Sequence, residues 1–519
     1  MPSASAFPYV ADLGDGTYRN PILVADYSDP DVERVGDDYW MVASSFNCTP
    51  GLPILHSRDL INWTLVGHAL TACPDLRKGD QPWYDQPRVG SGVWAPAIRY
   101  HGGKFWILVP LVDEGIYVVS ATDPRGPWSA PTLLAAGAGL IDPCPFWDED
   151  GRAWLCHGYS RSRSGIAHQL RLVPMAPDCS RLLGEGHVIF DGTAEHPFIE
   201  GPKFLKKDGW YYIFAPAGGV DGGWQTCLRS RTVEGPYELK IVLEQGASTI
   251  NGPHQGAMLD TPGGEWWFLH FQEDLPYGRI LHLQPVTWHD GWPVIGVDAD
   301  GNGIGEPVLT WKKPALPPQP IAIQPTDEDW RGARPGLPWQ WHANEQARWW
   351  SLTARPGHLR LTAEPVAGGD LRLAGNVLSQ KPVARAFRTL TSIDITDLKP
   401  GARAGLCVLG KAATSLLLER TADGVVAILR KDTHESVRHV VRGDLFRLRL
   451  DFHVSGRLSY FLAEGDGPWI PFHTVRPQAQ AGEWISARIG LTVIAPDGAG
   501  RGSQADFGPV RVTDLTAPI

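Results

Sequence analysis

The feature of this sequence that most restricts its fold is a short pattern that recurs between residues 36 and 270. In each copy an Asp/Gly turn is followed directly by aromatic and aliphatic residues, which is the signal of a β-hairpin. The copies are GDDYWMV, HGGKFWILV, EDGRAWLC, KDGWYYIF and PGGEWWFLH. A second strand-like segment follows each copy: LPILHS, GIYVVSA, IAHQLRL, QTCLRSR and GRILHLQ.

Five such units, each long enough for a four-stranded sheet, predict an all-β fold with a five-bladed β-propeller. Radial repetition leaves only short, protected sheet edges. The alternative is a long β-sandwich in which the hairpins recur by coincidence. The composition agrees with an all-β protein, because Gly 58, Pro 45 and Trp 22 supply turns and aromatic strands, whereas Met is only 4.

The phase of the repeat predicts which side chains meet on the propeller axis. Equivalent positions in successive blades face the same axis, and the position nine residues before each turn holds Asp29, Trp94, Asp142, Glu200 and Gln255, the last beside His254. An Asp next to a Pro is most often a turn cap. Three carboxylates in one phase indicate a function instead, because burying like charges together is unfavourable.

Carboxylates gathered around a pocket suit glycoside hydrolysis. One carboxylic acid protonates the leaving oxygen, while an ionised partner activates water or attacks carbon. A third negative charge nearby helps to keep the acid protonated near neutral pH. Sugars also stack on aromatic rings, for which the candidates, each equally a core residue, are Phe46, Trp83, Tyr84, Trp94, Phe146 and Trp147.

These residues resemble glycoside hydrolase family 43, in its branch of β-xylosidases and α-L-arabinofuranosidases. The resemblance covers about residues 18–310 and implies a five-bladed propeller and inverting hydrolysis. It is carried by these motifs in order: NPILVADYSDPDVERVGDDYWMVASSF, PGLPILHSRDLINWTLVGHAL, GVWAPAIRYHGGKFW, IDPCPFWDEDG, IEGPKFLKKDGWYY, GPHQGAML and GRILHLQPVTW.

The resemblance also implies roles for the catalytic residues. Asp29 is expected to be the general base and Glu200 the general acid, while Asp142 tunes the pKa of the acid and orients it. His254 matches a histidine at the channel centre, near which many relatives bind calcium or another ion through water. The chemistry itself is expected to require no cofactor.

The same resemblance implies a subsite for the terminal sugar, lined by Phe46, Trp94, Ala95, Ile141, Arg279 and His254. Arg279 is expected to hold the sugar hydroxyls or partly neutralise Asp142, since its planar fork carries a permanent charge; the alternative is a surface salt bridge. The sequence departs from the family at Lys203, where many relatives have His, so the leaving-group side is expected to differ. Ile141 replaces the aromatic residue usual in xylosidases, which leaves space at the pocket edge.

A second domain is predicted after the catalytic propeller of residues 1–311 and a proline-rich linker of residues 312–328. Residues 329–519 alternate apolar and polar side chains in short runs, which predicts an antiparallel β-sandwich. The closing WISARIGLTV and ADFGPVRVTDL resemble the jelly-roll, concanavalin-like domain of this branch, which sends a loop toward the active-site rim. Residues 495–504 are the candidate loop; the alternatives are a mobile hairpin and an independent carbohydrate-binding module.

The predicted function is an exo-acting inverting hydrolase that releases terminal β-D-xylose from short xylo-oligosaccharides. The alternatives are an α-L-arabinofuranosidase, or an enzyme with both activities, and a carbohydrate-binding propeller without catalysis. The expected partner is a small oligosaccharide, and assembly into a homo-oligomer stays open.

Charge and patterning exclude other classes of function. A net charge of −10 disfavours nucleic-acid binding, and no apolar run reaches membrane-spanning length. MPSASAFPYV lacks the features of a secretory signal, which predicts a cytoplasmic protein. Seven cysteines without a CxxC pair are expected to be buried, reduced thiols. The acidic residues Asp31, Asp37 and Asp38 are expected to be solvated at a turn.

Overall fold

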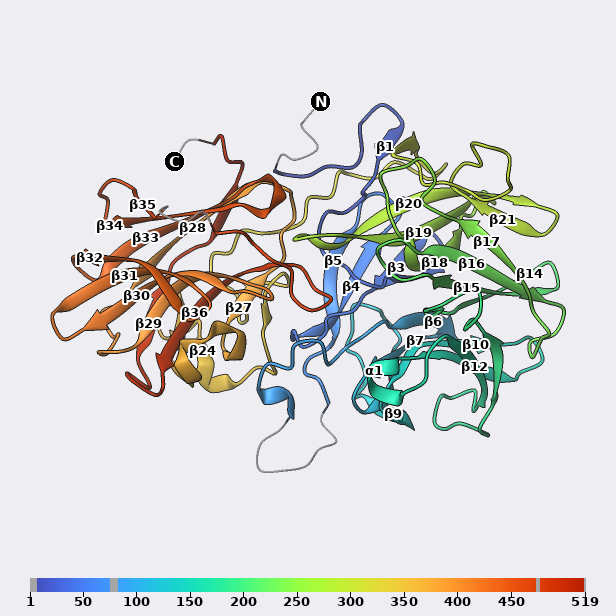
Figure 1. The fold of residues 1–519 in the computed structure, drawn as a ribbon, viewed down its shortest axis with the longest axis horizontal. Coiled ribbons are helices and arrows are strands. Elements are labelled where there is room, and N and C mark those ends of the chain that lie inside the picture. Colours follow the sequence, from blue (N-terminus) through green and yellow to red (C-terminus); the bar gives the residue numbers. More distant parts are fainter. Residues whose placement is uncertain (1–6, 75–82, 473–476, 518–519) are drawn as a thin grey trace.

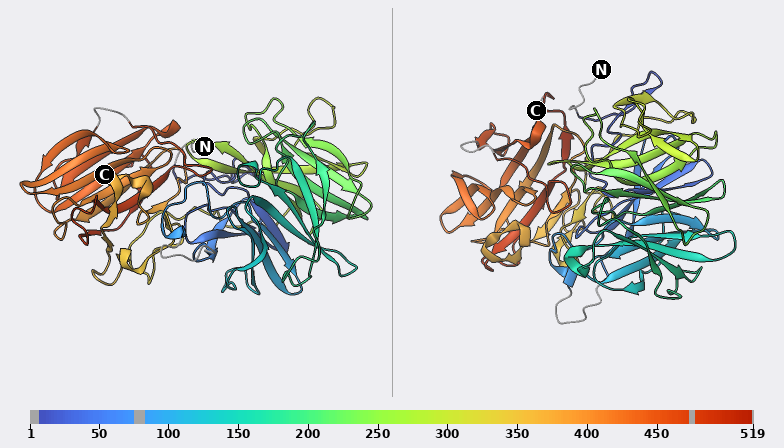
Figure 2. Two further views of the ribbon diagram at one scale, coloured as in Figure 1. Left: turned by 60° about the horizontal axis from the view of Figure 1, so that its bottom comes forward. Right: turned by 45° about the vertical axis from the view of Figure 1, so that its right-hand side comes forward.

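The structure of the protein is a computed structural model that describes residues 7–74, 83–472 and 477–517. Two β domains lie beside each other and contact along one side (Figures 1 and 2). Within those ranges, no helix is long and apolar enough to cross a membrane. Residues 1–6, on which the expectation of no secretory signal partly rests, lie outside the described residues.

Five four-stranded sheets follow one another along the chain, which confirms the predicted propeller (Figure 1). In each sheet the order of the strands in space is their order in the sequence, so the first strand of each blade is the innermost. The blades are β2 (Asp31–Val35), β3 (Asp38–Val42), β4 (Gly51–Ser57) and β5 (Thr64–Leu70); β6 (Ala97–His101), β7 (Lys104–Leu111), β8 (Gly115–Ala121) and β9 (Thr132–Ala136); β10 (Leu140–Trp147), β11 (Ala153–Tyr159), β12 (Gln169–Met175) and β13 (His187–Asp191); β14 (Lys203–Lys207), β15 (Trp210–Ala217), β16 (Trp224–Ser230) and β17 (Glu238–Leu243); and β18 (His254–Asp260), β19 (Trp266–Asp274), β20 (Gly278–His289) and β21 (Trp292–Ile295).

The predicted Asp/Gly turns are the connections between the first and second strands of the blades. The two ends of the propeller meet where β1 (Thr17–Arg19) pairs antiparallel with β22 (Thr310–Lys312). The ring closes between the first and fifth blades, where Arg34 on β2 donates two hydrogen bonds to Asp260 on β18, of 2.8 and 2.7 Å. This two-pronged geometry fixes the relative position of the two blades.

Helical structure in the described part of the chain is confined to single turns. They are α1 (Arg161–Ser164) and the 3₁₀ turns Trp83–Asp85, Ala347–Trp349, Ala367–Gly369, Leu371–Leu373 and Val454–Gly456. All seven cysteines are free and buried, as predicted.

The second domain is the predicted β-sandwich, with two eight-stranded sheets. One sheet has the order β23 (Gln340–Trp341), β27 (Leu378–Gln380), β36 (Arg488–Pro496), β29 (Arg403–Leu409), β30 (Thr414–Thr421), β31 (Gly424–Lys431) and β32 (His434–Val441), with β26 (Glu364–Val366) beside β36. The other has the order β24 (Trp350–Ser351), β25 (Leu359–Thr362), β37 (Gln504–Phe507), β28 (Phe387–Asp394), β33 (Leu445–Phe452), β34 (Leu458–Glu464) and β35 (Ile470–Phe472), with β38 (Arg511–Thr513) beside β28.

The two domains share a buried interface. Val24, Tyr277 and Ile280 of the propeller belong to the same apolar cluster as the core of the sandwich. Thr49 and Trp341 exchange backbone hydrogen bonds of 3.1 and 2.6 Å across the interface. Apolar burial and paired backbone groups therefore hold the sandwich against the first blade.

Replacement of Thr49 by Val should weaken this interface. The hydroxyl of Thr49, which is fully buried, donates a 2.6 Å hydrogen bond to the Ala343 carbonyl oxygen. Loss of the donor leaves a buried carbonyl unpaired, so the free energy of unfolding should fall by about 1–3 kcal/mol. Thermal unfolding measures the effect. Thr310→Val, at an exposed strand position, is the control, and equal melting temperatures for the two variants would contradict the assignment.

Candidate active site

Asp29 lies directly before β2 with a left-handed backbone, at φ 53°, and its side chain is buried. Its Oδ2 accepts hydrogen bonds from the hydroxyls of Ser44, at 2.6 Å, and Ser28, at 2.9 Å. Its Oδ1 accepts a 2.7 Å hydrogen bond from Nη1 of Arg279. Both carboxylate oxygens are thus held in place, and a positive charge faces one of them.

Asp142 lies in β10, where the register with β11 shifts between Ile141 and Cys144. Its φ is 55°, and its Oδ2 accepts a 2.7 Å hydrogen bond from the backbone N–H of Gly201. Burial raises the pKa of the Asp142 carboxyl well above its ordinary value, and the negative charges of Glu200 and Asp29 raise it further. Ionisation of Asp142 is therefore disfavoured in the folded protein.

Glu200 precedes β14 and is the most accessible of the three carboxylates, with 29% of its side chain exposed. Its Oε1 lies 3.0 Å from Nε2 of His254, which is fully buried at the start of β18. The structure thus brings together carboxylates from the first, third and fourth blades and an imidazole from the fifth, as the repeat phase predicted. That His254 would contact the predicted acid was not foreseen.

Arg279, the second residue of β20, is buried and not part of a surface salt bridge. Its Nη1 bonds to Asp29, at 2.7 Å, and to the Ser28 hydroxyl, at 2.9 Å. The expectation that it neutralises Asp142 is wrong, because its guanidinium pairs with Asp29 in the neighbouring blade. Its proposed contact with sugar hydroxyls stays a prediction.

The residues predicted to line the sugar subsite form a compact wall. Phe46 is buried and its ring lies 6.4 Å from the ring of Trp94, edge to face. Ala95 and Ile141 are also buried. Ile141 faces Gly158 across the β10–β11 pair, so its cross-strand partner contributes no side chain.

A tryptophan of the sandwich also reaches the site. Trp484 lies in the loop before β36, and its ring is 6.4 Å from Trp94, while Arg279 lies over the same ring at 5.4 Å. The prediction that residues 495–504 form this loop is wrong. That hairpin folds back on its own domain, where Ala363 and Ser503 share a backbone hydrogen bond of 2.8 Å. Trp484 opens the strand-like segment WISARIGLTV, but its φ is 64° and the strand itself begins at Arg488.

Several sequence candidates lie away from the carboxylates. Lys203 is buried inside the channel, with Nζ donating to the Pro96 carbonyl at 2.9 Å, so it does not alter the leaving-group side as expected. Phe146 and Trp147 line a separate cavity at the other end of the innermost strands. Asp31 is fully buried and paired with Arg99 at 2.6 Å, which overturns the expectation of a solvated turn residue.

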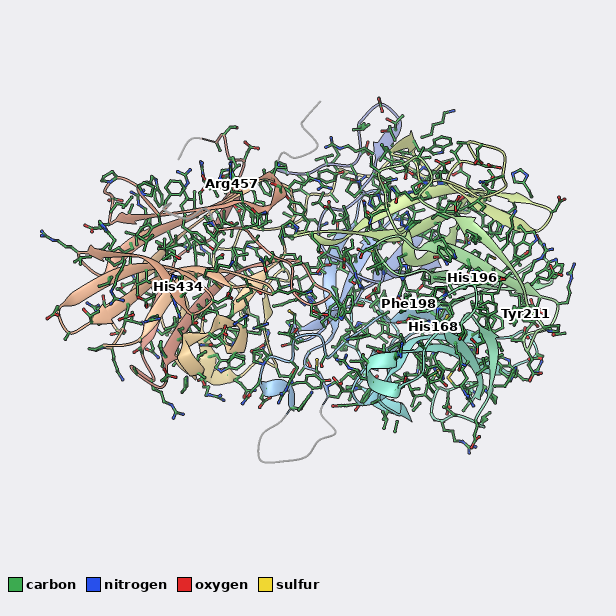
Figure 3. The ribbon with its side chains drawn as sticks, viewed as in Figure 1. His168, His196, Phe198, Tyr211, His434 and Arg457 are labelled. Atoms are coloured by element: carbon green, nitrogen blue, oxygen red, sulfur yellow. The ribbon has the colours of Figure 1, made fainter. Side chains whose placement is uncertain are left out.

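Phe198, two residues before Glu200, lies at the rim and is 56% exposed. Its backbone N–H donates to Nδ1 of His168 at 2.6 Å, and the two rings meet edge to face at 5.0 Å. Figure 3 shows the labelled side chains of His168 and Phe198 together on the propeller. An aromatic surface therefore adjoins the accessible carboxylate.

The residues around His254 fit a metal ion only weakly. No group of three or more His, Cys, Asp or Glu side chains in the described residues is arranged to hold a metal. Nδ1 of His254 is buried and has no hydrogen-bond partner among those residues. A single imidazole nitrogen suits only a cation that keeps most of its water, as the family resemblance implies.

The raised pKa of Asp142 should appear in the stability of the protein. The folded chain keeps this proton to higher pH than the unfolded chain, so the contribution of Asp142 to the free energy of unfolding falls as pH rises above about 4. Asp142→Asn cannot ionise and should therefore raise the melting temperature at pH 8 but not at pH 4, by roughly 1 °C per kcal/mol for a chain of 519 residues. Thermal unfolding across pH measures the difference.

Asp148→Asn is the matched control, with the opposite sign. Although Asp148 is partly buried, hydrogen bonds from Lys206 and Tyr211 hold the pKa of its carboxyl below the ordinary value. Its replacement should lower the melting temperature at neutral pH. Destabilisation by Asp142→Asn at pH 8 would show that repulsion among the carboxylates does not lower the free energy of unfolding.

Comparison with known proteins agrees with this arrangement. The chain matches the family described as "Glycosyl hydrolases family 43" over residues 18–293, and the "Beta xylosidase C-terminal Concanavalin A-like domain" over residues 327–513. It is 42% identical to a "Putative beta-xylosidase" of Xylanibacter ruminicola, over 86% of this chain and 82% of that one. A non-reducing end alpha-L-arabinofuranosidase of Bacteroides ovatus is 32% identical, over 82% and 80% of the two chains.

The fold is similarly shared with a solved structure. The crystal structure of a xylan beta-1,4-xylosidase from Bacillus halodurans superposes with a TM-score of 0.83 at 25% identity, covering 95% of this chain and 99% of that one. The match spans both domains. With its propeller, its carboxylates and its concanavalin-like domain, this chain belongs to glycoside hydrolase family 43.

Proposed function

We propose that the protein is an exo-acting, inverting β-xylosidase that releases terminal β-D-xylose from short xylo-oligosaccharides. A carbohydrate substrate follows from the family. The observation that carries the proposal is the contrast between two carboxylates. Asp29 is buried and bonded to Arg279, whereas Glu200 is accessible beside His254. Asp29 is suited to take a proton from water, and Glu200 is suited to donate a proton to the leaving oxygen.

In this mechanism ionised Asp29 takes a proton from water as that water attacks the anomeric carbon. Ser28, Ser44 and Arg279 orient both oxygens of the base. Glu200 donates its proton to the glycosidic oxygen, which leaves with the rest of the chain. Inversion in one step requires about 6.5–9.5 Å between the two carboxyl groups, so that the water fits.

Asp142 supports this division of roles from beneath the two reacting groups. Its bond to the N–H of Gly201 ties it to the residue directly after Glu200. When Glu200 has given up its proton, a neutral Asp142 adds no further negative charge beside it. Asp142 is therefore proposed to position Glu200 and to favour its charged form after proton donation, without contact with the glycosidic bond that breaks.

The walls of the site suit attack at the end of a sugar chain. Phe46 and Trp94 form one side, and Trp484 of the sandwich closes another. A pocket closed in this way admits a terminal residue more readily than the middle of a polymer. The open side lies next to Glu200 and Phe198, where the leaving sugar would exit.

An α-L-arabinofuranosidase activity, alone or beside the first, is the second candidate. The Ile141–Gly158 pair places no aromatic side chain at the pocket edge, which would suit a five-membered sugar ring as well. The Bacteroides ovatus relative named as an arabinofuranosidase supports this alternative. A hydrated cation near His254 also stays a prediction.

Asp29→Asn and Glu200→Gln should separate the base from the acid. Loss of the base should lower kcat/KM on p-nitrophenyl β-D-xylopyranoside and on xylobiose alike, by about 10²–10⁴-fold. Loss of the acid should affect xylobiose far more, because nitrophenolate leaves without a proton. Parallel assays with p-nitrophenyl α-L-arabinofuranoside show which terminal sugar the protein hydrolyses with the higher kcat/KM. Glu195→Gln, at an exposed position nearby, is the control.

The first product should be α-xylose, because inversion changes the configuration of a β-xyloside. Proton NMR during the first minutes of hydrolysis distinguishes the anomers before they interconvert. Initial release of β-xylose would contradict the inverting mechanism, and full activity of Asp29→Asn would remove the proposed base.

Trp484→Ala should weaken substrate binding more than chemistry. The ring lies against Trp94 on the wall of the sugar subsite and is not in contact with Asp29 or Glu200. KM should therefore rise by about tenfold while kcat falls less. Trp311→Ala is the matched control, because both tryptophans are 38% exposed and Trp311 lies on β22, outside the site. An unchanged KM for Trp484→Ala would mean that the sandwich does not contribute to the pocket.

A further inference from the structure

A second cavity opens at the other end of the propeller axis. It has a volume of about 1350 Å³, mouth included, and all five innermost strands line it. The catalytic carboxylates lie at the starts of these strands, whereas the cavity rim is formed by their ends, such as Arg34 on β2 and Trp147 on β10. Five residues of strand separate Asp29 from Arg34, which corresponds to roughly 16 Å. The mouth of the cavity therefore opens away from the catalytic pocket, while its floor at Asp31 and Lys203 lies two and three residues along the chain from Asp29 and Glu200.

The floor of this cavity holds buried charges of both signs. Asp31 is fully buried; its Oδ2 pairs with Arg99 at 2.6 Å, but its Oδ1 has no hydrogen-bond partner among the described residues. Lys203 is also buried, donates to the Pro96 carbonyl at 2.9 Å, and lies 4.0 Å from Asp31. Asp31 and Lys203 are 0% and 3% exposed, so a ligand would meet the lining groups above them, such as Glu33 and Lys206.

The rim of the cavity is aromatic. Tyr100 is 40% exposed at the end of β6. Trp147 stacks on His101 with ring centroids 4.6 Å apart, and Phe146 stacks on Phe204 at 4.9 Å. Aromatic walls above a few converging polar groups are the usual form of a small-molecule site.

We propose that this cavity is a second, non-catalytic binding site for a neutral oligosaccharide. A sugar hydroxyl donates and accepts at once, so it can bond to Glu33 as well as to Lys206 and Lys207 on the cavity wall. The lining carries both signs of charge, so an ion of either sign meets like charges there; the residues are Asp31, Glu33 and Asp260 with Arg34, Arg99, Lys203, Lys206 and Lys207. The apolar face of a sugar ring matches the rim at Tyr100. The choice of a xylose-based sugar rests on the proposed function.

The test is to count binding sites in the full chain carrying Glu200→Gln, which prevents cleavage, with xylotriose as the probe in calorimetry. Two classes of site are expected. Adding Tyr100→Ala, an exposed position, should remove one class, and adding Glu33→Gln, which keeps the side-chain shape, should do the same. Trp94→Ala should remove the other class. Trp311→Ala, remote from both sites, should retain two.

A single class of site in the Glu200→Gln protein, or two classes that survive both Tyr100→Ala and Glu33→Gln, would overturn the proposal. Tighter binding of glucuronate than of xylotriose at the site that depends on Tyr100 would overturn the assignment to a neutral sugar. The proposed function is judged separately, by hydrolysis in the wild-type protein. If the wild type cleaves no xyloside but Tyr100→Ala still abolishes one class of binding, the cavity proposal stands and the proposed activity fails.

Discussion

The site depends on the burial of carboxylates that repel one another. Asp29 and Asp142 are both almost completely buried, and Glu200 adds its charge beside them. Each is compensated differently: Asp29 by a guanidinium and two hydroxyls, Asp142 by one backbone N–H and by a raised pKa, and Glu200 by His254 and by solvent. The three carboxyl groups thus lie in unequal environments, as a division of acid and base roles requires. The propeller makes this feasible because each blade delivers one group to the axis.

The sandwich takes part in the same arrangement. Asp26, three residues before Asp29, accepts the backbone N–H of Arg279 at 2.9 Å and that of Ser486 at 2.8 Å. One buried carboxylate therefore fixes both the strand that carries the arginine and the loop that carries Trp484. Lys381 of the sandwich lies over the Tyr27 ring at 4.1 Å and extends the contact. Any shift of the sandwich would thus move groups of the active site, so the second domain is part of the pocket wall.

Much of this architecture was predictable because its signals are local. Turn residues followed by alternating strands marked all five blades, and one count from those turns found Asp29, Asp142 and Glu200. The same local geometry also explains an error. Trp147 lies five residues beyond Asp142 on one strand, or roughly 16 Å away, so it belongs to the far end of the channel. Strand rise alone would have excluded it from the catalytic pocket.

The sequence by itself determined the fold class, the family and the carboxylates that converge. Periodicity and repeat phase depend only on residues close together in the chain. Only the tertiary structure decided that Arg279 pairs with Asp29, that Trp484 covers the sugar wall and that Lys203 lies buried in the channel. These facts depend on contacts between segments far apart in the chain, and such contacts are set by how blades and domains pack together. No local sequence pattern predicts these contacts, because each side chain could pair with several partners and only the packing of the blades and domains determines which one is close.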